Sequence, residues 1–395
     1  MSKGESSHLI VSYIPSFYKV ELYNRISEIE DIFVIFLKDN EGSRNANFVR
    51  QDMRFPHMTL QHGDGKFAKI SGLRRLLDLL LSRQFSTVTT PGWDQLACWI
   101  LILLPFTWQR RMVMESTSRE SQRRDAHGMS LKSWVYRLAK SLFMRHVDLA
   151  LVAGKRQEAY LREHGFQGPF RNLLGVGLTF AKPFSRLPSS HGARRFLYLG
   201  RLSSEKNLDF MIEAFLTSKL VEDQASLTLV GEGPLEDQLR SRFGSEPGII
   251  FAPYVEREVL PQMMAEYDAL VLLSLSEPYG LVVEEALKCD MPVLLSHACG
   301  AVDTIVFDGV QGLVVSPYDS EGATKAFSEL ASRERYNGFL QRIQADPNLE
   351  RIDEAQISGY LSDGRLPFES KEEYLRLLNP GSGADFIETL HPKGP

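Results

Sequence analysis

Short runs of β-branched and other apolar residues alternate with amphipathic helical patterns along most of the chain. In the first half, strands are expected at residues 8–13, 32–37, 111–114 and 148–153. In the second half they are expected at residues 196–199, 226–230, 249–251, 269–273, 292–296 and 312–315. Helical patterns lie between most of these runs, an order that favours parallel sheets covered by helices. The expected fold class is therefore α/β.

Residues 184–193 interrupt this alternation. They are rich in Pro, Ser, Gly and His and show no apolar period, which is typical of a linker. Two Rossmann-like domains facing each other across a cleft are expected, with ligands bound beyond the carboxyl ends of their strands. The predicted boundaries are residues 1–187 for the first domain and 188–372 for the second, followed by a tail, residues 373–395, that packs back on the first domain.

The composition is that of a folded protein. The chain has 395 residues, of which 43% are hydrophobic and 24% charged, enough apolar material for two domains. Its formal net charge of -5 argues against a nucleic-acid partner. Its three cysteines cannot form a disulfide framework, and its first residues lack the pattern of a signal segment. A cytoplasmic protein is expected.

Three helical segments of the first half carry prominent apolar side chains, and membrane contact is considered for the first two. Residues 96–106 are the longest apolar stretch, well short of the roughly 20 residues that a spanning helix needs, and a buried helix is expected there. Leucines surround Arg74, Arg75 and Arg83. Core packing with exposed arginines is the expectation for that segment, and peripheral contact with the inner membrane face is the alternative. A helix expected at residues 134–145 has its apolar side chains on one side.

The segment from Ser276 to Leu287 follows an apolar run and opens a helix. Glu277 precedes this helix and Glu285 lies about two turns further on, so both carboxylates can face one ligand. Gly280 leaves room for a ligand to approach the backbone, and the N–H groups at the helix start form a seat for a phosphate. The alternative is an acidic first turn that only complements the helix dipole.

A second motif, from Leu199 to Asn207, again combines a strand, a glycine-containing turn and a helix. Arg201 and Lys206 would lie at the carboxyl edge of the sheet, where fixed cations can stabilise a diphosphate leaving group. An ordinary solvated basic turn is the alternative. The sequence has no Asp-x-Asp pair and no His/Cys cluster of zinc-like spacing, so no metal is expected.

Five motifs follow one another in the order seen in GT4 glycosyltransferases. They are Gly200-Arg201-x4-Lys206, Val230-Gly231-Glu232-Gly233-Pro234, Glu277-x7-Glu285 with Pro278-Tyr279-Gly280, Pro292-Val293, and Asp308-Gly309-x2-Gly312. The chain thus resembles these retaining, metal-independent enzymes of GT-B fold, of the bacterial type that makes polysaccharides and glycoconjugates. The resemblance implies transfer of a hexose-type unit from a nucleotide-diphosphate sugar.

The resemblance also implies roles for individual residues. Glu277 would contact the donor sugar near the reacting centre, and Glu285 would bind the ribose hydroxyls. Arg201 and Lys206 would hold the diphosphate. The other implied donor contacts are Gly200, Tyr254, Val255, Tyr279, Gly280, Leu281 and Val282. One departure is Cys299, which begins a loop where the family often has two glycines.

The first half resembles, more loosely, the acceptor domain of a bacterial subset of the same family, on motifs that include Gly92-Trp93-Asp94 and Glu115-Ser116-Thr117. Glu115 follows a strand end and is expected to point into the cleft. Its alternative is a capping residue paired with nearby arginines. His57, expected in a short polar turn, and Arg124, expected on a helix face, are further acceptor-side candidates. A solvated or structural role is the alternative for both.

The resulting hypothesis is a retaining transferase without a protein nucleophile. The acceptor attacks from the face that the leaving group occupies, and the departing phosphate takes the acceptor proton. No cofactor is expected beyond the nucleotide sugar, for which UDP is the favoured nucleotide. The acceptor is a glycan, a lipid-linked sugar or a small molecule. The alternatives are a non-catalytic partner that binds nucleotide sugars, and another enzyme of this fold such as a phosphorylase or an epimerase.

Overall fold

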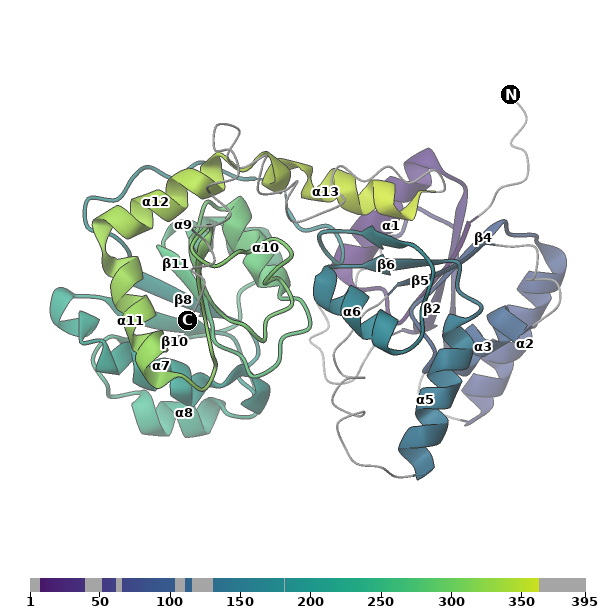
Figure 1. Cartoon of the computed structure of the whole chain (residues 1–395), viewed down its shortest axis with the longest axis horizontal. Coiled ribbons are helices and arrows are strands. Elements are labelled where there is room, and N and C mark those ends of the chain that lie inside the picture. Colours follow the sequence, from purple (N-terminus) through teal and green to yellow (C-terminus); the bar gives the residue numbers. More distant parts are fainter. Residues whose placement is uncertain are drawn as a thin grey trace, which may run out of the picture. The chain divides into compact units, whose positions relative to one another are not determined.

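A computed structural model describes residues 8–39, 52–61, 66–103, 111–115, 131–180 and 182–361. They divide into two compact units, each a parallel sheet with helices packed on it (Figure 1). The first unit runs to Leu178 and takes in the chain again from Asp353, and the second runs from Thr179 to Ile352. The predicted α/β class with two Rossmann-like domains is confirmed.

The first unit contains seven parallel strands in the order β3-β2-β1-β4-β5-β6-β7. The strands are β1 (His8–Ser12), β2 (Ile32–Lys38), β3 (His57–Gln61), β4 (Thr87–Thr90), β5 (Arg111–Glu115), β6 (Leu149–Val152) and β7 (Phe170–Asn172). The helices are α1 (Phe17–Ile29), α2 (Lys66–Ser82), α3 (Leu96–Leu103), α5 (Leu131–Met144) and α6 (Lys155–Glu163). Alternate strand residues bury two apolar clusters: Leu9 faces α2, α3 and α5, and Ile10 faces α1.

The second unit contains six parallel strands in the order β10-β9-β8-β11-β12-β13. The strands are β8 (Arg195–Leu199), β9 (Ser226–Val230), β10 (Ile249–Ala252), β11 (Ala269–Leu272), β12 (Val293–Ser296) and β13 (Gly312–Val315). The helices are α7 (Leu208–Thr217), α8 (Glu236–Phe243), α9 (Leu260–Ala265), α10 (Leu281–Lys288), α11 (Ser320–Ala331) and α12 (Arg333–Gln344), with a short 3-10 helix, η3 (Ser204–Lys206). The strand order reverses direction between β8 and β11, where sheets of this kind bind ligands.

The helix α13 (Pro347–Tyr360) begins in the second unit and ends in the first. It was not anticipated from the sequence, and neither were α9, α11 and α12. The tail expected at residues 373–395 lies outside the described residues.

Two elements of the first unit differ from expectation. His57 begins a strand, β3, and does not lie in a polar turn. The turn was predicted because only one residue of this edge strand, Leu60, is buried, so no apolar alternation marks it. The helix α3 is buried on one side only, since Leu96 and Leu103 at its two ends are 68% and 55% exposed.

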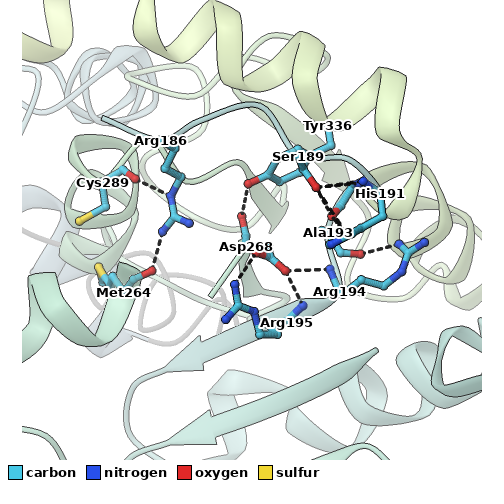
Figure 2. A network of polar contacts seen from close by, with 11 residues as sticks. Arg186, Ser189, His191, Ala193, Arg194, Arg195, Met264, Asp268, Cys289 and Tyr336 are labelled. Carbon is cyan, nitrogen blue, oxygen red and sulfur yellow. Dashed lines mark hydrogen bonds and ion pairs between the residues drawn. The ribbon is translucent and has the colours of Figure 1, made fainter. Parts of the chain in front are cut away.

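The segment expected as a linker, residues 184–193, is fastened to the second unit (Figure 2). The guanidinium group of Arg186 donates hydrogen bonds of 2.7 and 2.5 Å to two main-chain carbonyl oxygens. Next to this segment, the carboxylate of Asp268 accepts the backbone N–H groups of Arg194 and Arg195 at 2.9 and 2.8 Å. The chain therefore leaves the first unit earlier than the Pro/Ser-rich composition indicated.

Candidate functional site

The turns that follow β8 and β9 lie against each other at the carboxyl edge of the second sheet. The N–H of Gly200 donates to the carbonyl oxygen of Val230 at 3.0 Å. A Cβ atom on Gly231, whose φ is +141°, would lie 2.0 Å from the Gly200 oxygen, and one on Gly233 would lie 2.3 Å from the Leu202 oxygen. Only glycine permits this approach. The spacing of the two glycines thus fixes the path of the turn that carries Arg201 and Lys206.

Lys206 ends η3 and is held by the residue that follows it. Asn207 adopts the left-handed conformation, with φ of 58°, and its side-chain amide donates to the carbonyl oxygens of Leu273 and Pro317 at 3.3 and 2.9 Å. These bonds tie the turn to the end of β11. The ammonium group of Lys206 then forms an ion pair with the carboxylate of Glu277, and both side chains are mostly buried. Sequence reasoning predicted both charges but missed the part played by Asn207.

Glu277 is held in turn by the loop after β12. Its N–H donates to the oxygen of Ala298 at 3.3 Å and its carbonyl oxygen accepts the N–H of Gly300 at 2.9 Å. A Cβ atom on Gly300 would lie 1.9 Å from the oxygen of Pro278, so this residue must be glycine. The loop that departs from the family pattern at Cys299 is therefore the one that positions the backbone of Glu277.

The helix α10 begins at Gly280, beside the Lys206–Glu277 pair. Gly280 has φ of +91°, and a Cβ atom there would lie 3.3 Å from Cγ of Glu277. Leu281 and Val282, which open the helix, are half-buried. Their N–H groups belong to the first turn, where a helix attracts anions. The structure thus brings together a cation, a carboxylate and a helix amino terminus at one sheet edge.

Two neighbouring carboxyl groups of α10 have different surroundings. Glu284 accepts a hydrogen bond from the Thr179 hydroxyl at 2.8 Å and pairs with the ammonium group of Lys288 at 3.0 Å. Glu285 is 4% exposed, and burial raises its pKa to about 7 despite the opposing charge of Arg257. Among the described residues, none donates a hydrogen bond to its carboxyl group. Glu285 therefore lacks the hydroxyl and ammonium partners that Glu284 has.

The remaining donor-side candidates are placed as follows. Arg201 is exposed, and its carbonyl oxygen accepts the Tyr198 hydroxyl at 2.7 Å. Tyr254 and Val255 follow β10 at the same sheet edge, Tyr254 exposed and Val255 half-buried. Tyr279 is buried, and burial together with the Glu284 carboxylate raises the pKa of its phenol. Its ring therefore belongs to the core beneath the site.

Glu115, the main acceptor-side candidate, ends β5 and is buried. Its carboxylate accepts the ammonium group of Lys19 and the hydroxyl of Tyr360, each at 2.5 Å. Lys19 also donates to the Tyr360 oxygen at 3.0 Å. The partners are a lysine and a tyrosine, where arginines were the expected alternative. Tyr360 comes from α13, which the sequence reasoning did not anticipate.

Of the two other acceptor-side candidates, the structure describes only His57, and it does not lie at the carboxyl edge of the first sheet. His57 is the exposed first residue of β3 and therefore lies at the amino end of a parallel strand. Its Nδ1 lies 3.0 Å from the oxygen of Phe55. Arg124 lies outside the described residues. At the carboxyl ends of β1 and β4, the Tyr13 hydroxyl donates to Asp94 of the Gly92-Trp93-Asp94 motif at 2.5 Å, and the part played by Tyr13 was missed.

The three cysteines are buried free thiols, as expected. Within the described ranges, no cluster of three or more His, Cys, Asp or Glu side chains is suited to hold a metal ion. The helices of those ranges include none with the length and apolar character needed to cross a membrane.

The match to a known protein family lies within the second unit. Residues 181–343 match the model of the family described as Glycosyl transferases group 1. Glycogen synthase of Mycobacterium tuberculosis is 27% identical over 191 residues, 46% of this chain and 46% of the relative. D-inositol 3-phosphate glycosyltransferase of Geodermatophilus obscurus is 30% identical over 235 residues, 53% of this chain and 52% of the relative. The chain spans about half the length of these curated relatives.

Similarity to solved structures extends further along the chain. The Anabaena protein HepE, solved in complex with UDP and glucose, superposes with a TM-score of 0.65 at 17% sequence identity, covering 91% of this chain and 100% of that one. At this identity the match concerns the fold. Residues 181–343 thus match the glycosyl transferases group 1 model, within a chain that has the GT-B fold of two Rossmann-like domains.

Proposed function

We propose that the chain is a retaining glycosyltransferase of the GT4 type that uses a nucleotide-diphosphate sugar and needs no divalent cation. The observation that carries this proposal is the Lys206–Glu277 ion pair at the carboxyl edge of the second sheet, beside the first turn of α10. A cation and helix amides suit a diphosphate, and a carboxylate suits the hydroxyls of a sugar.

Donor binding exchanges the partners of this pair. The diphosphate of the donor carries more charge than the Glu277 carboxylate, so it takes over the ammonium group of Lys206. Arg201, exposed on the same turn, and the N–H groups of Leu281 and Val282 hold the remaining phosphate oxygens. The released carboxylate of Glu277 then turns to the sugar. Fixed cations in this position do the work that a metal ion does in other transferases.

Glu285 binds the ribose. Its two oxygens can accept bonds from the two neighbouring ribose hydroxyls, and the described residues do not occupy them. Because burial raises the pKa of this group to about 7, ribose binding favours its charged form and releases a proton near neutral pH. Tyr254 and Val255, at the end of β10, lie beside the base.

The reaction breaks the bond between the anomeric carbon and the diphosphate oxygen. The acceptor hydroxyl attacks from the same face, so the new glycosidic bond keeps the anomeric configuration. Its proton passes to the departing phosphate oxygen, and the products are a glycoside and a nucleoside diphosphate. The negative charge of Glu277 stabilises the positive charge that develops on the sugar.

UDP is the proposed nucleotide, because structural neighbours such as HepE and the pneumococcal transferase GtfA were solved with UDP bound. The acceptor is a glycan, a lipid-linked sugar or a small molecule, bound at the carboxyl edge of the first sheet, where Tyr13 and Asp94 lie. A bacterial glycoconjugate pathway and a cytoplasmic location fit such a donor.

Turnover by the full chain tests this proposal. The chain is incubated with UDP-, GDP-, ADP- and TDP-sugars and a panel of acceptors in excess chelator, and nucleoside diphosphate release is measured. The anomeric configuration of the product is read by NMR. Release in chelator with a retained configuration is expected. Turnover that requires magnesium or manganese, or an inverted product, would contradict the mechanism. Tight binding of UDP-sugar without turnover would favour a non-catalytic partner.

A further inference from the structure

Three helices of the first unit present apolar side chains on the side that faces away from the sheet. The helices α2, α3 and α5 pack on the same sheet face, because Leu76, Leu101 and Phe143 belong to one buried cluster. The rings of Trp99 on α3 and Phe143 on α5 are 5.2 Å apart, and Figure 1 shows the three helices together in the first unit. Their outer sides therefore form one surface, called here the outer helix face.

The helix α5 departs most from the usual arrangement. One side buries Lys140, Phe143 and Met144 against the core. On the other side, where polar residues normally lie, the exposed large side chains are Trp134 at 60%, Val135 at 53%, Leu138 at 55% and Leu142 at 45%. Three of them are spaced by four residues and so form one stripe along the helix. The apolar side predicted from the sequence is thus the exposed side.

The other two helices extend this apolar surface. On α3, Leu96 and Leu103 are 68% and 55% exposed, and on α2, Ile70 and Leu81 are 68% and 76% exposed. These three helices therefore hold eight of the fourteen strongly exposed large hydrophobic side chains found in the described residues. Single exposed apolar residues are ordinary, but such a concentration marks a surface that is covered in use.

The charge of these helices indicates what covers them. By sequence, α2 contains four Lys or Arg and one acid, α5 contains three Lys or Arg and no acid, and α3 contains no charged residue. The whole chain has the opposite sign, with a net charge of -5. Arg74 and Arg137 are exposed beside the apolar side chains. Apolar side chains with a tryptophan, beside exposed arginines that outnumber the one exposed acid, Asp78, match the interface of an anionic bilayer.

We propose that the outer helix face rests on the surface of a membrane that contains anionic phospholipids, with Trp134 at the level of the headgroups. The proposal concerns a surface of the first unit and is independent of the reaction proposed above. The helices lie on the bilayer and do not cross it.

Vesicle flotation of the full chain tests the proposal. We expect binding to vesicles of phosphatidylcholine with phosphatidylglycerol, weaker binding at high salt, and little binding to phosphatidylcholine alone. The variant Trp134→Ser/Leu138→Ser/Leu142→Ser should bind about tenfold less or weaker still, because it removes most of the apolar stripe. The matched control, Leu187→Ser/Val259→Ser/Tyr318→Ser, removes three exposed apolar side chains from the second unit and should bind like the wild type.

Two further measurements separate a lipid from other occupants. Arg74→Gln/Arg137→Gln should weaken binding to anionic vesicles, and brominated lipids should quench a component of tryptophan fluorescence that Trp134→Phe lacks. The urea unfolding curve of the triple variant should match that of the wild type, which shows that the first unit is folded. The proposal is overturned if wild type and triple variant bind vesicles equally, or if wild type binds none. It is also overturned if sedimentation without lipid shows a dimer that the triple variant cannot form.

Discussion

Glu284 and Glu285 are adjacent on α10 and similarly buried, yet their chemistry differs. Glu284 has a fixed counter-charge in Lys288 and a hydroxyl partner in Thr179. For Glu285, burial is the dominant influence and raises its pKa from 4.5 to about 7. The sequence distinguished the two through the spacing of Glu277 and Glu285. It could not predict the pKa, which depends on residues packed from elsewhere in the fold.

The pKa of Glu285 makes stability depend on pH. Between pH 4.5 and about 7 the folded chain holds a proton that the unfolded chain has lost, so the free energy of unfolding falls as the pH rises through this window. Because glutamine has no ionisable group, Glu285→Gln removes this fall in the free energy of unfolding. Relative to wild type, the variant should gain stability between about pH 4.5 and pH 7, by up to roughly 3 kcal/mol for a shift of this size. Urea unfolding at several pH values measures the difference.

The control for this prediction is Glu284→Gln. It leaves Lys288 buried without its counter-charge, so it should destabilise the chain at neutral pH. A Glu285→Gln variant whose stability relative to wild type is the same at low and neutral pH would show that the carboxyl of Glu285 titrates normally.

At the scale of elements, turns that need glycine build the site. Gly231 and Gly300 are required where two loops approach closely, and the Gly-x-Gly and Cys-Gly patterns could be read from the sequence. Strands with apolar runs were also predictable. The strand β4 was missed because three of its four residues, TVTT, are threonines, although all four positions are buried. Its Thr89 bonds to the His8 imidazole at 2.7 Å, a pairing that local sequence does not reveal.

Gly300→Ala tests the close approach of the loop that holds Glu277. The added Cβ would lie 1.9 Å from a backbone oxygen, so the loop must shift. We expect a loss of about 1–3 kcal/mol in stability, measured by urea unfolding. We also expect weaker UDP binding by calorimetry, because the added Cβ meets Pro278 and Tyr279 and so displaces the first turn of α10, which is proposed to hold the diphosphate. Gly309→Ala is the control, since its Cβ meets nothing within 4 Å but its φ is +76°. It should cost only about 1–2 kcal/mol of backbone strain and leave UDP affinity intact. If Gly300→Ala and Gly309→Ala bound UDP equally well, the role of Gly300 in shaping the donor site would be contradicted.

At the scale of the whole molecule, the two units share the doubly wound strand order that the alternating pattern predicted. The gathering of the donor-side candidates at one sheet edge was predictable, because the segments that carry them follow strand ends and parallel strands end at one edge. The surroundings of Glu115 were not predictable. Its partners Lys19 and Tyr360 lie 96 and 245 positions away in sequence. Lys19 comes from α1, and Tyr360 reaches Glu115 because α13 returns the chain to the first unit.

Tyr360→Phe tests how α13 is attached to the first unit. The variant removes a hydroxyl that donates to Glu115 and leaves one oxygen of that buried carboxylate without this partner. Stability should fall by about 1–3 kcal/mol, with UDP affinity unchanged, in calorimetry and urea unfolding. Tyr318→Phe, at a side chain that is 77% exposed, is the control and should have little effect. Similar stability of the two variants would mean that the buried contacts among Lys19, Glu115 and Tyr360 contribute little to the free energy of unfolding.

The central claim is that Lys206 and Glu277 form the reacting centre, and one pair of variants tests it most directly. UDP affinity by calorimetry and turnover in chelator are measured for Glu277→Gln and Lys206→Ala. Glu277→Gln frees Lys206 for the diphosphate, so UDP affinity should be equal or higher, while kcat falls by about 10²–10³ because the developing charge on the sugar is no longer stabilised. Lys206→Ala should weaken UDP binding by roughly 1.5–3 kcal/mol, the usual loss of a hydrogen bond to a charged group. Normal turnover by Glu277→Gln, or unchanged UDP affinity in Lys206→Ala, would contradict the claim.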